Sequence, residues 1–393
     1  MKQYAKIIWA LWIILALVGG YGLIERLVTG HQLATYSSYV PWGMWVAAYI
    51  FFVGLSSGSF LLASLYYVFK VARLERIARL SLFTAGVTIV MALVTVGLDL
   101  GRMEKAVSVF YRPHFTSLIT WEVWLYTAYL ILVIMALKYA VRQEPKKLGP
   151  QVTKDDDQKL VRLMTYGIPL VIAFTGAGGA LFGTISARAA WHTSLYPVIF
   201  IVGALLSGVA LMTFMAWAFC DNHDESWHEL LQFLGKLVLG LICIELILEW
   251  AEFSIPLWYG VGSEAELVKY VLFGPFWYVF WLVRILLGAV LPLYLLMGKK
   301  DAKSIGIASF LVAVTYFAVR LNLVIPAQVT PELRGLEHAY LDPIGNHLSF
   351  HYLPSFFEWQ VLMGVVALGM ALFYFGQRHL SLMQTLNNRE VSR

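Results

Sequence analysis

Long apolar runs separated by short polar segments make up most of this chain. Ten of the runs approach or exceed the length of about 20 residues that a helix needs to cross the hydrocarbon core of a bilayer. They lack the strict alternation of apolar and polar residues that a barrel strand requires, so helices are expected. The predicted spans are Ile7–Ile24, Met44–Phe69, Leu80–Leu98, Ser117–Val141, Leu163–Ala187, Leu195–Cys220, Leu231–Phe253, Phe276–Met297, Ser304–Val324 and Phe356–Gly376.

The composition agrees with a polytopic membrane protein. Hydrophobic residues make up 60% of the 393 residues and charged residues only 13%, a balance too apolar for a soluble domain of this size. The predicted fold is all-α, with about ten transmembrane helices arranged as two four-helix bundles plus flanking helices. The formal net charge of +5 indicates no nucleic-acid partner, because basic residues retained on one side of the membrane produce it.

Polar segments divide the chain into seven parts. The segment around the Lys-Asp-Asp-Asp run reads as a solvated linker, and a long outer loop rich in proline and histidine is expected to fold over the outer face or to dock a partner. The parts are 1–39 (first transmembrane helix and outer loop), 40–142 (first half of bundle one), 143–162 (cytoplasmic linker), 163–194 (last helix of bundle one), 195–324 (second four-helix bundle), 325–355 (long outer loop) and 356–393 (last transmembrane helix and cytoplasmic tail).

The distribution of Lys and Arg predicts the orientation. About 19 of these residues fall on the side of the two termini and about 7 on the other side, so the positive-inside rule places both termini in the cytoplasm of a cell with this chain in its inner membrane. Lys2 and Lys6 before the first apolar run would also suit a secretory signal. A small-residue cleavage site does not follow, which favours a retained span.

A shift of 150 residues aligns the two halves of the chain weakly. It places Ser57-Gly58 on Ser207-Gly208, and it places Asp99 on Glu249. Two related helical bundles would explain this repeat. Chance identity between apolar segments is the alternative explanation.

Histidine and cysteine positions argue against a haem or an iron–sulfur cluster in this chain. A membrane b-type haem needs axial histidines inside helices, and no predicted span offers one at mid-membrane. Cys220 and Cys243 lie in different predicted helices and are expected to be packing thiols, so no metal site is expected. The histidines assigned to outer loops or helix ends are His31, His114, His192, His338, His347 and His351.

Two acids and a histidine lie near the outer ends of the third and fourth spans. We expect Asp99, His114 and Glu122 to share one face, where a neutral imidazole beside a carboxyl supplies the hydrogen-bond donor and the proton acceptor that a quinone needs. Trp121 and neighbouring aromatic residues would line a flat pocket. The alternative is an interfacial ion pair between Asp99 and Arg102, a loop histidine and aromatic membrane anchors.

Charged residues also occur within the later spans. Glu245, Glu249 and Glu252 follow the spacing i, i+4, i+7 and form one stripe of the seventh helix, while Arg284 and Arg320 lie at similar depth in the next two helices. Such residues are costly in lipid, so they must face protein, water or each other. Both a structural ion-pair network and a path for protons fit this pattern.

Five motifs between Val40 and Leu211 carry a resemblance to a known family. They are Val40-Pro-Trp-Gly-Met-Trp, Phe52-Val-Gly-Leu-Ser-Ser-Gly-Ser-Phe-Leu-Leu, Gly97-Leu-Asp-Leu-Gly-Arg, Pro113-His-Phe-Thr-Ser-Leu-Ile-Thr-Trp-Glu and Phe174-Thr-Gly-Ala-Gly-Gly. These motifs resemble the NrfD/PsrC family, the membrane subunits of polysulfide-reductase-type complexes. Ten spans resemble the longer members of that family.

The resemblance implies a haem-free site for menaquinone or ubiquinone near the outer face of the first bundle. It implies that His114, Asp99 and Glu122 handle the quinone and its protons, with Arg102 and His192 as further members of the site. The implied partners are a ferredoxin-like iron–sulfur subunit outside the membrane and a catalytic molybdopterin, hydrogenase or multihaem cytochrome subunit.

Three functions are compatible with the sequence. The favoured one is a quinone-interacting subunit of a respiratory oxidoreductase complex, catalytic only with its partner subunits and with or without coupling to proton translocation. A proton- or ion-coupled transporter would also explain the charged later helices. A passive anchor for an extracytoplasmic enzyme would need none of the charged groups. The sequence gives no indication of the terminal substrate or of the direction of electron flow.

Overall fold

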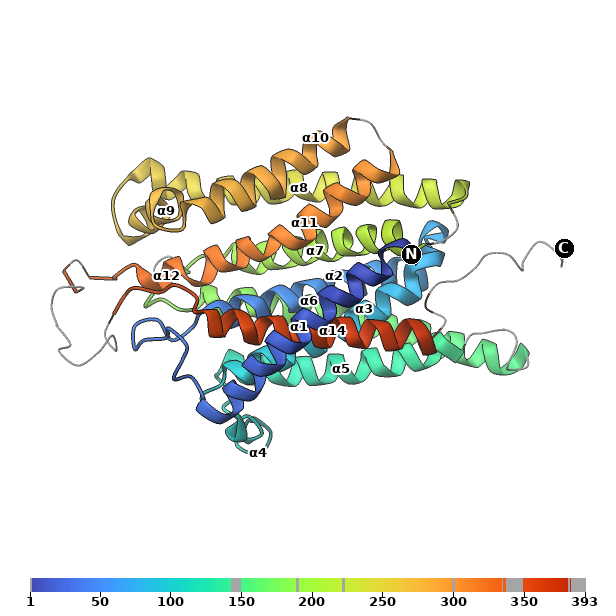
Figure 1. Ribbon diagram of the computed structural model, residues 1–393, viewed down its shortest axis with the longest axis horizontal. Coiled ribbons are helices and arrows are strands. Elements are labelled where there is room, and N and C mark those ends of the chain that lie inside the picture. The colour runs from blue at the N-terminus through green and yellow to red at the C-terminus, as the bar shows by residue number, and fades with distance from the viewer. Residues whose placement is uncertain are drawn as a thin grey trace.

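The protein is a bundle of long helices whose axes run along a common direction, seen from the side in the computed structural model (Figure 1). The structure describes residues 2–142, 150–188, 191–220, 223–298, 301–333, 335–336, 349–380 and 382. Within these residues, 10 helices are long and apolar enough to cross a membrane, and no strand is present. The predicted all-α membrane fold is confirmed.

Each predicted span coincides with one long helical segment. Shorter helical pieces occupy the connections: η1 (Ala72–Leu74), η2 (Met103–Lys105), α4 (Ser108–Tyr111), α9 (Ser263–Phe273) and α12 (Pro326–Val329). The spans are α1 (Lys2–Thr29), α2 (Met44–Tyr67), α3 (Glu75–Asp99), α5 (Leu118–Arg142), α6 (Pro150–Gly183), α7 (Tyr196–Phe219), α8 (Glu225–Tyr259), η3 (Val279–Val290) continued by α10 (Leu291–Met297), α11 (Ala302–Val324) and α14 (Phe356–His379).

The predicted linker becomes the start of a helix. From Pro150 onward its described residues belong to α6, which has 34 residues and is therefore about 51 Å long, well beyond the roughly 30 Å of a hydrocarbon core. Its polar first turns extend past the apolar part of the bundle, where Lys159 and Asp155 form an i,i+4 ion pair of 2.5 Å. The polar run therefore continues α6 into the aqueous phase.

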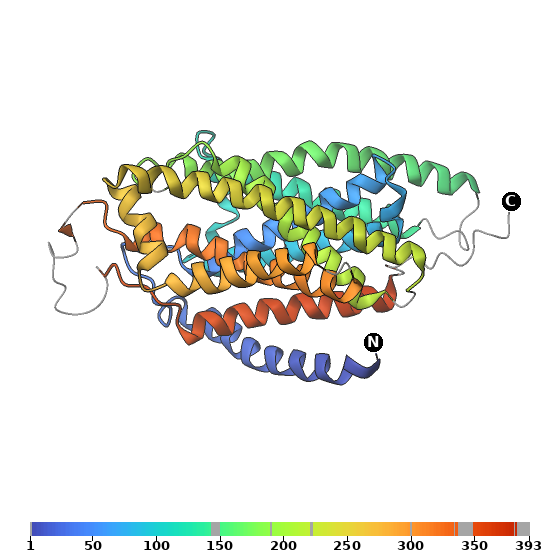
Figure 2. The ribbon, with the colours of Figure 1, turned by 90° about the horizontal axis from the view of Figure 1, so that it is seen from above.

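Helix packing divides the spans into two groups of four. In the first, α2 packs on α3 and α6, and α5 packs on both α3 and α6. In the second, α7 packs on α8 and α11, while η3 and α10 pack on α11 and α10 reaches α8. The remaining two helices, α1 and α14, lie side by side at one edge of the molecule, with α14 against α3 (Figure 2).

The two groups meet where α2 crosses α7. A Cβ added to Gly58 would lie 1.9 Å from the carbonyl oxygen of Ala204 and 2.9 Å from Cα of Gly208, and a Cβ on Gly208 would lie 2.6 Å from Cα of Gly58. These two glycines are counterparts in the 150-residue shift. Repeat-related residues touch each other only near the axis that relates the repeats, so this contact supports the internal duplication.

The described part of the segment 325–355 packs back onto the end of the bundle. The short helix α12 is buried, and residues 349–355 lie along the segment that leads into α2. Ser37 Oγ donates to the carbonyl of Ser349 at 2.7 Å, Thr35 Oγ1 donates to that of Leu353 at 2.6 Å, and the Met44 amide donates to the Tyr352 hydroxyl at 2.8 Å. The predicted loop histidines His338 and His347 lie outside the described residues.

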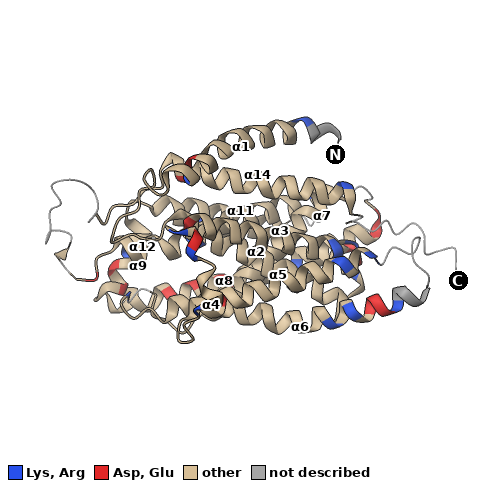
Figure 3. Ribbon diagram, turned by 90° about the horizontal axis from the view of Figure 1, so that it is seen from below, with Lys and Arg blue, Asp and Glu red and all other residues tan. Residues whose placement is uncertain are grey.

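Basic residues gather at the end of the bundle where α1 begins and α14 ends (Figure 3). At this end Arg76 of α3 forms an ion pair with Asp224, which also accepts the Trp227 amide at 3.0 Å and so caps the start of α8. The hydrogen bond from Arg76 lowers the pKa of Asp224. Both termini of the helical bundle therefore lie on its more basic side, in line with the predicted orientation.

Candidate functional sites in the two bundles

A buried carboxyl without a partner marks the first candidate site. Glu122 of α5 is 4% exposed, and its Oε1 has no hydrogen-bond partner among the described residues. It lines a cavity of about 20 Å³, room for about one water. The Tyr49 hydroxyl donates to that of Tyr126 at 2.7 Å in the same cavity wall. An unsatisfied buried carboxyl is destabilising, so this group is available to a water or a ligand.

His114 lies in the loop just before α5, on the outside of the molecule. Its ring is exposed, and its Nδ1 is 2.9 Å from the hydroxyl of Thr116. The indole Nε1 of Trp121 donates to the carbonyl of Phe115 at 2.9 Å. This bond ties the loop to the first turn of α5 at Trp121, one residue before Glu122. Phe115, Trp121 and Trp124 form a cluster of rings there.

Asp99 belongs to a different group of residues. Its Oδ1 accepts a hydrogen bond of 2.8 Å from Tyr36. Beside it the guanidinium of Arg26 donates to the carbonyls of Leu98 (2.7 Å) and Leu100 (2.8 Å) at the end of α3, where a cation is favoured by the helix dipole. The alternative pairing of Asp99 with Arg102 is not formed: Arg102 is exposed, and the described ion pairs do not include it.

Glu358 of α14 completes this outer polar cluster, which we define as Arg26, His31, Tyr36, Asp99, Tyr352 and Glu358. Its carboxylate is fully buried and accepts the amide (3.1 Å) and hydroxyl (3.0 Å) of Thr35, together with the hydroxyl of Tyr352. Burial raises the pKa of Tyr36. Burial, and secondarily Arg26, lowers the pKa of His31. The cluster holds α1, α3 and α14 together at the outer end of the molecule.

The sequence did not identify Glu358 as a site residue. Its partner Thr35 lies 323 positions earlier in the chain, so spacing carries no information about that contact. The local signal was the capping box formed by Ser355 and Glu358 at the start of α14, which indicates a helix start and nothing more.

The structure does not join the three residues expected at one face. Within the described part of the chain, no hydrogen bond or ion pair links Asp99, His114 or Glu122 to one another. Their common role stays a prediction. His192 does not join this group either. Its exposed ring lies 2.9 Å from the carbonyl of Gly183 and lines a cavity of the second bundle.

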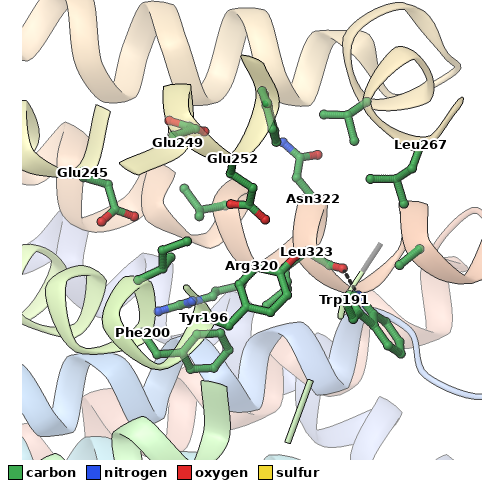
Figure 4. Close-up of a pocket in the computed structure, with 15 residues that line it drawn as sticks. Trp191, Tyr196, Phe200, Glu245, Glu249, Glu252, Leu267, Arg320, Asn322 and Leu323 are labelled. Carbon is green, nitrogen blue, oxygen red and sulfur yellow. Dashed lines mark hydrogen bonds between the residues drawn. The ribbon is translucent and has the colours of Figure 1, made fainter. Parts of the chain in front are cut away.

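The second candidate site is the charged stripe of α8 (Figure 4). Arg284 forms the expected ion pair with this stripe, at 3.0 Å between Nη2 and Oε2 of Glu249, and its side chain is 2% exposed. Tyr316 donates a hydrogen bond of 2.6 Å to Glu245. Arg284 sits within η3, a π-helical stretch of the kind that is rare and frequent at functional sites.

Two cavities meet at Glu252. The inner cavity, of about 60 Å³, is lined by Glu245, Glu249 and Glu252 with Arg320 opposite them. The outer cavity, of about 180 Å³, is lined by Glu252 together with His192 and Glu264. At about 15 Å³ for each water position, they have room for about four and about twelve waters. Glu252, Phe253 and Leu267 line both cavities, and Glu252 supplies the ionisable group at this boundary.

These features define a class of protein: an integral membrane protein with about ten spanning helices that keeps carboxyl groups in small internal cavities. Residues 32–332 match the family described as "Polysulphide reductase, NrfD". The chain belongs to this family, as the resemblance predicted. The match covers both helix bundles, from the segment before α2 to the end of α12.

Relatives align with nearly the whole chain. A selenate reductase subunit of Mesobacillus selenatarsenatis is 33% identical over 91% of this chain and 90% of its own length. The Hdr-like menaquinol oxidoreductase integral membrane subunit of Archaeoglobus fulgidus is 28% identical, covering 97% of this chain and 95% of its own. A putative dimethyl sulfoxide reductase membrane subunit of Halobacterium salinarum is 26% identical over 92% and 86%.

Proposed function

We propose that this chain is the quinone- or quinol-interacting membrane subunit of a respiratory reductase complex. The observation that carries the proposal is Glu122, a buried carboxyl with an oxygen unpartnered among the described residues, in an otherwise apolar cavity at the outer end of the first bundle. Support also comes from the relatives, which are named as subunits of selenate and dimethyl sulfoxide reductases and of a menaquinol oxidoreductase.

The polar groups around Glu122 suit a quinone head group, but the cavity itself is too small to hold one. A free carboxyl oxygen and two tyrosine hydroxyls offer the acceptor and donors that a quinol or quinone needs, but about 20 Å³ leaves no room for a ring. We therefore assign the ring to the mouth of the cavity between α5 and α6, where Gly178 and Leu181 are partly exposed.

A bound quinone would supply reversible uptake of two electrons and two protons. In this proposal Glu122 takes up or gives back one proton at its free Oε1, and the hydrogen-bonded pair of Tyr49 and Tyr126 holds the polar side of the site in place. The buried apolar lining, with Phe174 and Phe182, keeps bulk water away. His114, tied to the first turn of α5, passes the proton between Glu122 and the outer aqueous phase.

The proposed partners are those that the family resemblance implies. Electrons would pass between this site and an extracytoplasmic ferredoxin-like iron–sulfur subunit, and from there to a catalytic molybdopterin, hydrogenase or multihaem cytochrome subunit. The chain would lie in the inner membrane with both termini in the cytoplasm, which is the orientation that puts the Glu122 end of the bundle outside.

We expect His114→Ala to lower quinol-dependent turnover about tenfold while the complex assembles normally. An exposed relay can be partly replaced by water, so the loss is smaller than the 10²- to 10⁴-fold typical of a direct proton donor. Turnover of a quinol analogue by the purified complex is the measurement. Thr116→Val, which removes only the hydroxyl beside the imidazole, should change it less than threefold. Full activity of His114→Ala would remove this residue from the proposed route.

We further propose that the second bundle conducts protons. The observation in favour is that Glu252 lines both the outer and the inner cavity, so waters there would connect His192 and Glu264 with Glu245. A third cavity of about 60 Å³, lined by Lys236 and Gln232, lies nearer the other end of the same bundle. From Leu239, which lines this third cavity, to Glu245 of the inner cavity, α8 advances about 9 Å past buried Ile242.

Glu252→Gln is expected to lower the number of protons moved per electron to the value set by quinol chemistry alone. Glutamine keeps the size of the side chain and removes the exchangeable proton. The measurement is proton release by the complex in lipid vesicles, recorded together with electron transfer. Glu229→Gln is the control, because Glu229 is exposed near the start of α8 and lines neither cavity; it should leave the ratio unchanged. An unchanged ratio in Glu252→Gln would contradict a path through this residue.

A further inference from the structure

One aromatic residue forms a wall common to the two candidate sites. Phe200 of α7 lines the Glu122 cavity of the first bundle and also the inner acidic cavity of the second. On the acidic side, the guanidinium of Arg320 lies over its ring, 4.3 Å from the centroid, a geometry typical of a cation–π contact. The same guanidinium is 5.2 Å from the ring of Tyr316. Arg320 is therefore the charged group next to the partition.

Glycines let this side chain reach the boundary between the bundles. A Cβ on Gly203 of α7 would lie 3.1 Å from Nη2 of Arg320, and one on Gly54 of α2 would lie 4.0 Å from it. Gly54 belongs to the first bundle, on the helix that also supplies Tyr49 and Val53 to the Glu122 cavity. Arg320, which starts on α11 in the second bundle, thus extends past α7 to the edge of the first.

The charge of Arg320 has no fixed counterion in the part of the chain that the structure describes. The Arg320 side chain is 1% exposed, and its Nε has no hydrogen-bond partner among the described residues. The ion pairs found among these residues do not include Arg320. Arg284, by contrast, is paired with Glu249, and Glu245 accepts a hydrogen bond from Tyr316. A buried cation without an ion-pair partner is costly, so the energy of the Arg320 guanidinium depends strongly on the charge of the carboxyls on either side.

We propose that Arg320 is the electrostatic link between the Glu122 site and the acidic cavity of the second bundle. This inference rests on the proposed function of both cavities. When Glu122 gives up a proton, its negative charge draws the guanidinium toward the first bundle. The inner cavity then loses positive charge, and Glu245 or Glu252 binds one proton from the outer cavity. When Glu122 takes up a proton again, the guanidinium returns and that proton is released.

Arg320 is a positioning residue in this scheme, because it stabilises charge on carboxyls and forms or breaks no bond itself. The arrangement has the elements that coupling requires: two distinct sites and one group whose position both sites bias. Glu122 lies across Phe200 from it, and Glu245, Glu249 and Glu252 line the inner cavity with it (Figure 4). Arg284 and Arg320 both lie near the ring of Tyr316, at 6.0 and 5.2 Å from its centroid.

The test measures protons moved per electron by the complete complex in lipid vesicles, with quinol as the electron donor. We expect Arg320→Gln to lower this ratio to the level of Glu252→Gln, and Arg320→Lys to restore at least half of the loss. Arg73→Gln is the matched control, because Arg73 also stacks on a ring, that of Phe233 at 5.8 Å, but is exposed at the far end of the molecule. Its ratio should equal that of the unmodified complex.

The outcomes separate the inference from the functions on which it rests. A lowered ratio in Glu252→Gln together with an unchanged ratio in Arg320→Gln would overturn the role of Arg320 and leave the proton path standing. An unchanged ratio in both would overturn the path and the link together. If the Arg320→Gln complex does not assemble, Phe200→Leu is the variant to measure. It removes the ring under the guanidinium and keeps an apolar partition. A ratio of protons to electrons identical to that of the unmodified complex would overturn the inference.

Discussion

Glu122→Gln is expected to lower quinol-dependent turnover of the assembled complex by about 10²- to 10⁴-fold, the range typical of a lost general acid or base. The amide keeps the size and polarity of the carboxyl but exchanges no proton. Because Oε1 of Glu122 has no partner to lose among the described residues, the substitution breaks no hydrogen bond at that atom. Activity should therefore fall without a matching fall in stability, and turnover and thermal unfolding of the same preparation measure the two effects.

A second acid on the same outer face provides the control. Glu104 lies in the short helix η2 and is exposed, so Glu104→Gln changes the net charge by the same amount at the surface. Its turnover should stay within about twofold of the unmodified complex, since an exposed charge is screened by salt. Glu122→Gln with full turnover would show that the buried carboxyl takes no part in proton exchange with the quinone and would contradict the proposed site.

The sequence predicted the helices well because their signal is local. A run of about 20 apolar residues has to cross the membrane as a helix whatever surrounds it, and every predicted span coincides with a helix of the structure. The short helical pieces of the connections and the π-helical form of η3 were not predicted. The short helix α9 buries only a narrow stripe that includes Val268 and Val271, and the π-helical form of η3 leaves no mark in the pattern of apolar residues.

The sites were less predictable because they depend on contacts between distant segments. The ion pair of Arg284 with the acidic stripe followed from helix order and depth alone. The placement of Asp99 did not, since Tyr36 and Glu358, its neighbours in the outer polar cluster, come from a loop and from the last span. The cavity that contains Glu122 is formed by α2, α5, α6 and α7. The spacing of residues within one helix does not predict which side chains of the other three helices will face it.

The α2–α7 crossing shows how a weak repeat in the sequence acquires a physical meaning. The shift of 150 residues paired Gly58 with Gly208 without any reason for glycine at either position. In the structure each of them faces the backbone of the other helix, and close approach of two membrane helices requires residues without side chains at the contact. The identity at this position is thus explained by a contact that both glycines share.

Gly58→Ala is expected to destabilise the subunit by about 3 kcal/mol or more, at the upper end of overpacking costs. The added methyl group would lie 1.9 Å from the carbonyl oxygen of Ala204 and 2.9 Å from Cα of Gly208. Both are backbone atoms, so no side chain can rotate away and α2 and α7 must separate. Thermal unfolding of the purified subunit in detergent, together with its yield from membranes, measures the effect.

Gly240→Ala is the matched control, because it makes the same substitution inside α8 at a position where a Cβ meets nothing within 4 Å. Alanine is the better helix former by about 1 kcal/mol, so this variant should unfold at the same temperature as the unmodified subunit or slightly above it. Gly208→Ala should reproduce the loss seen for Gly58→Ala. The double variant should then lose less than the sum, because both methyl groups force apart one and the same contact. Equal unfolding temperatures for Gly58→Ala and Gly240→Ala would mean that the two bundles do not meet through these glycines.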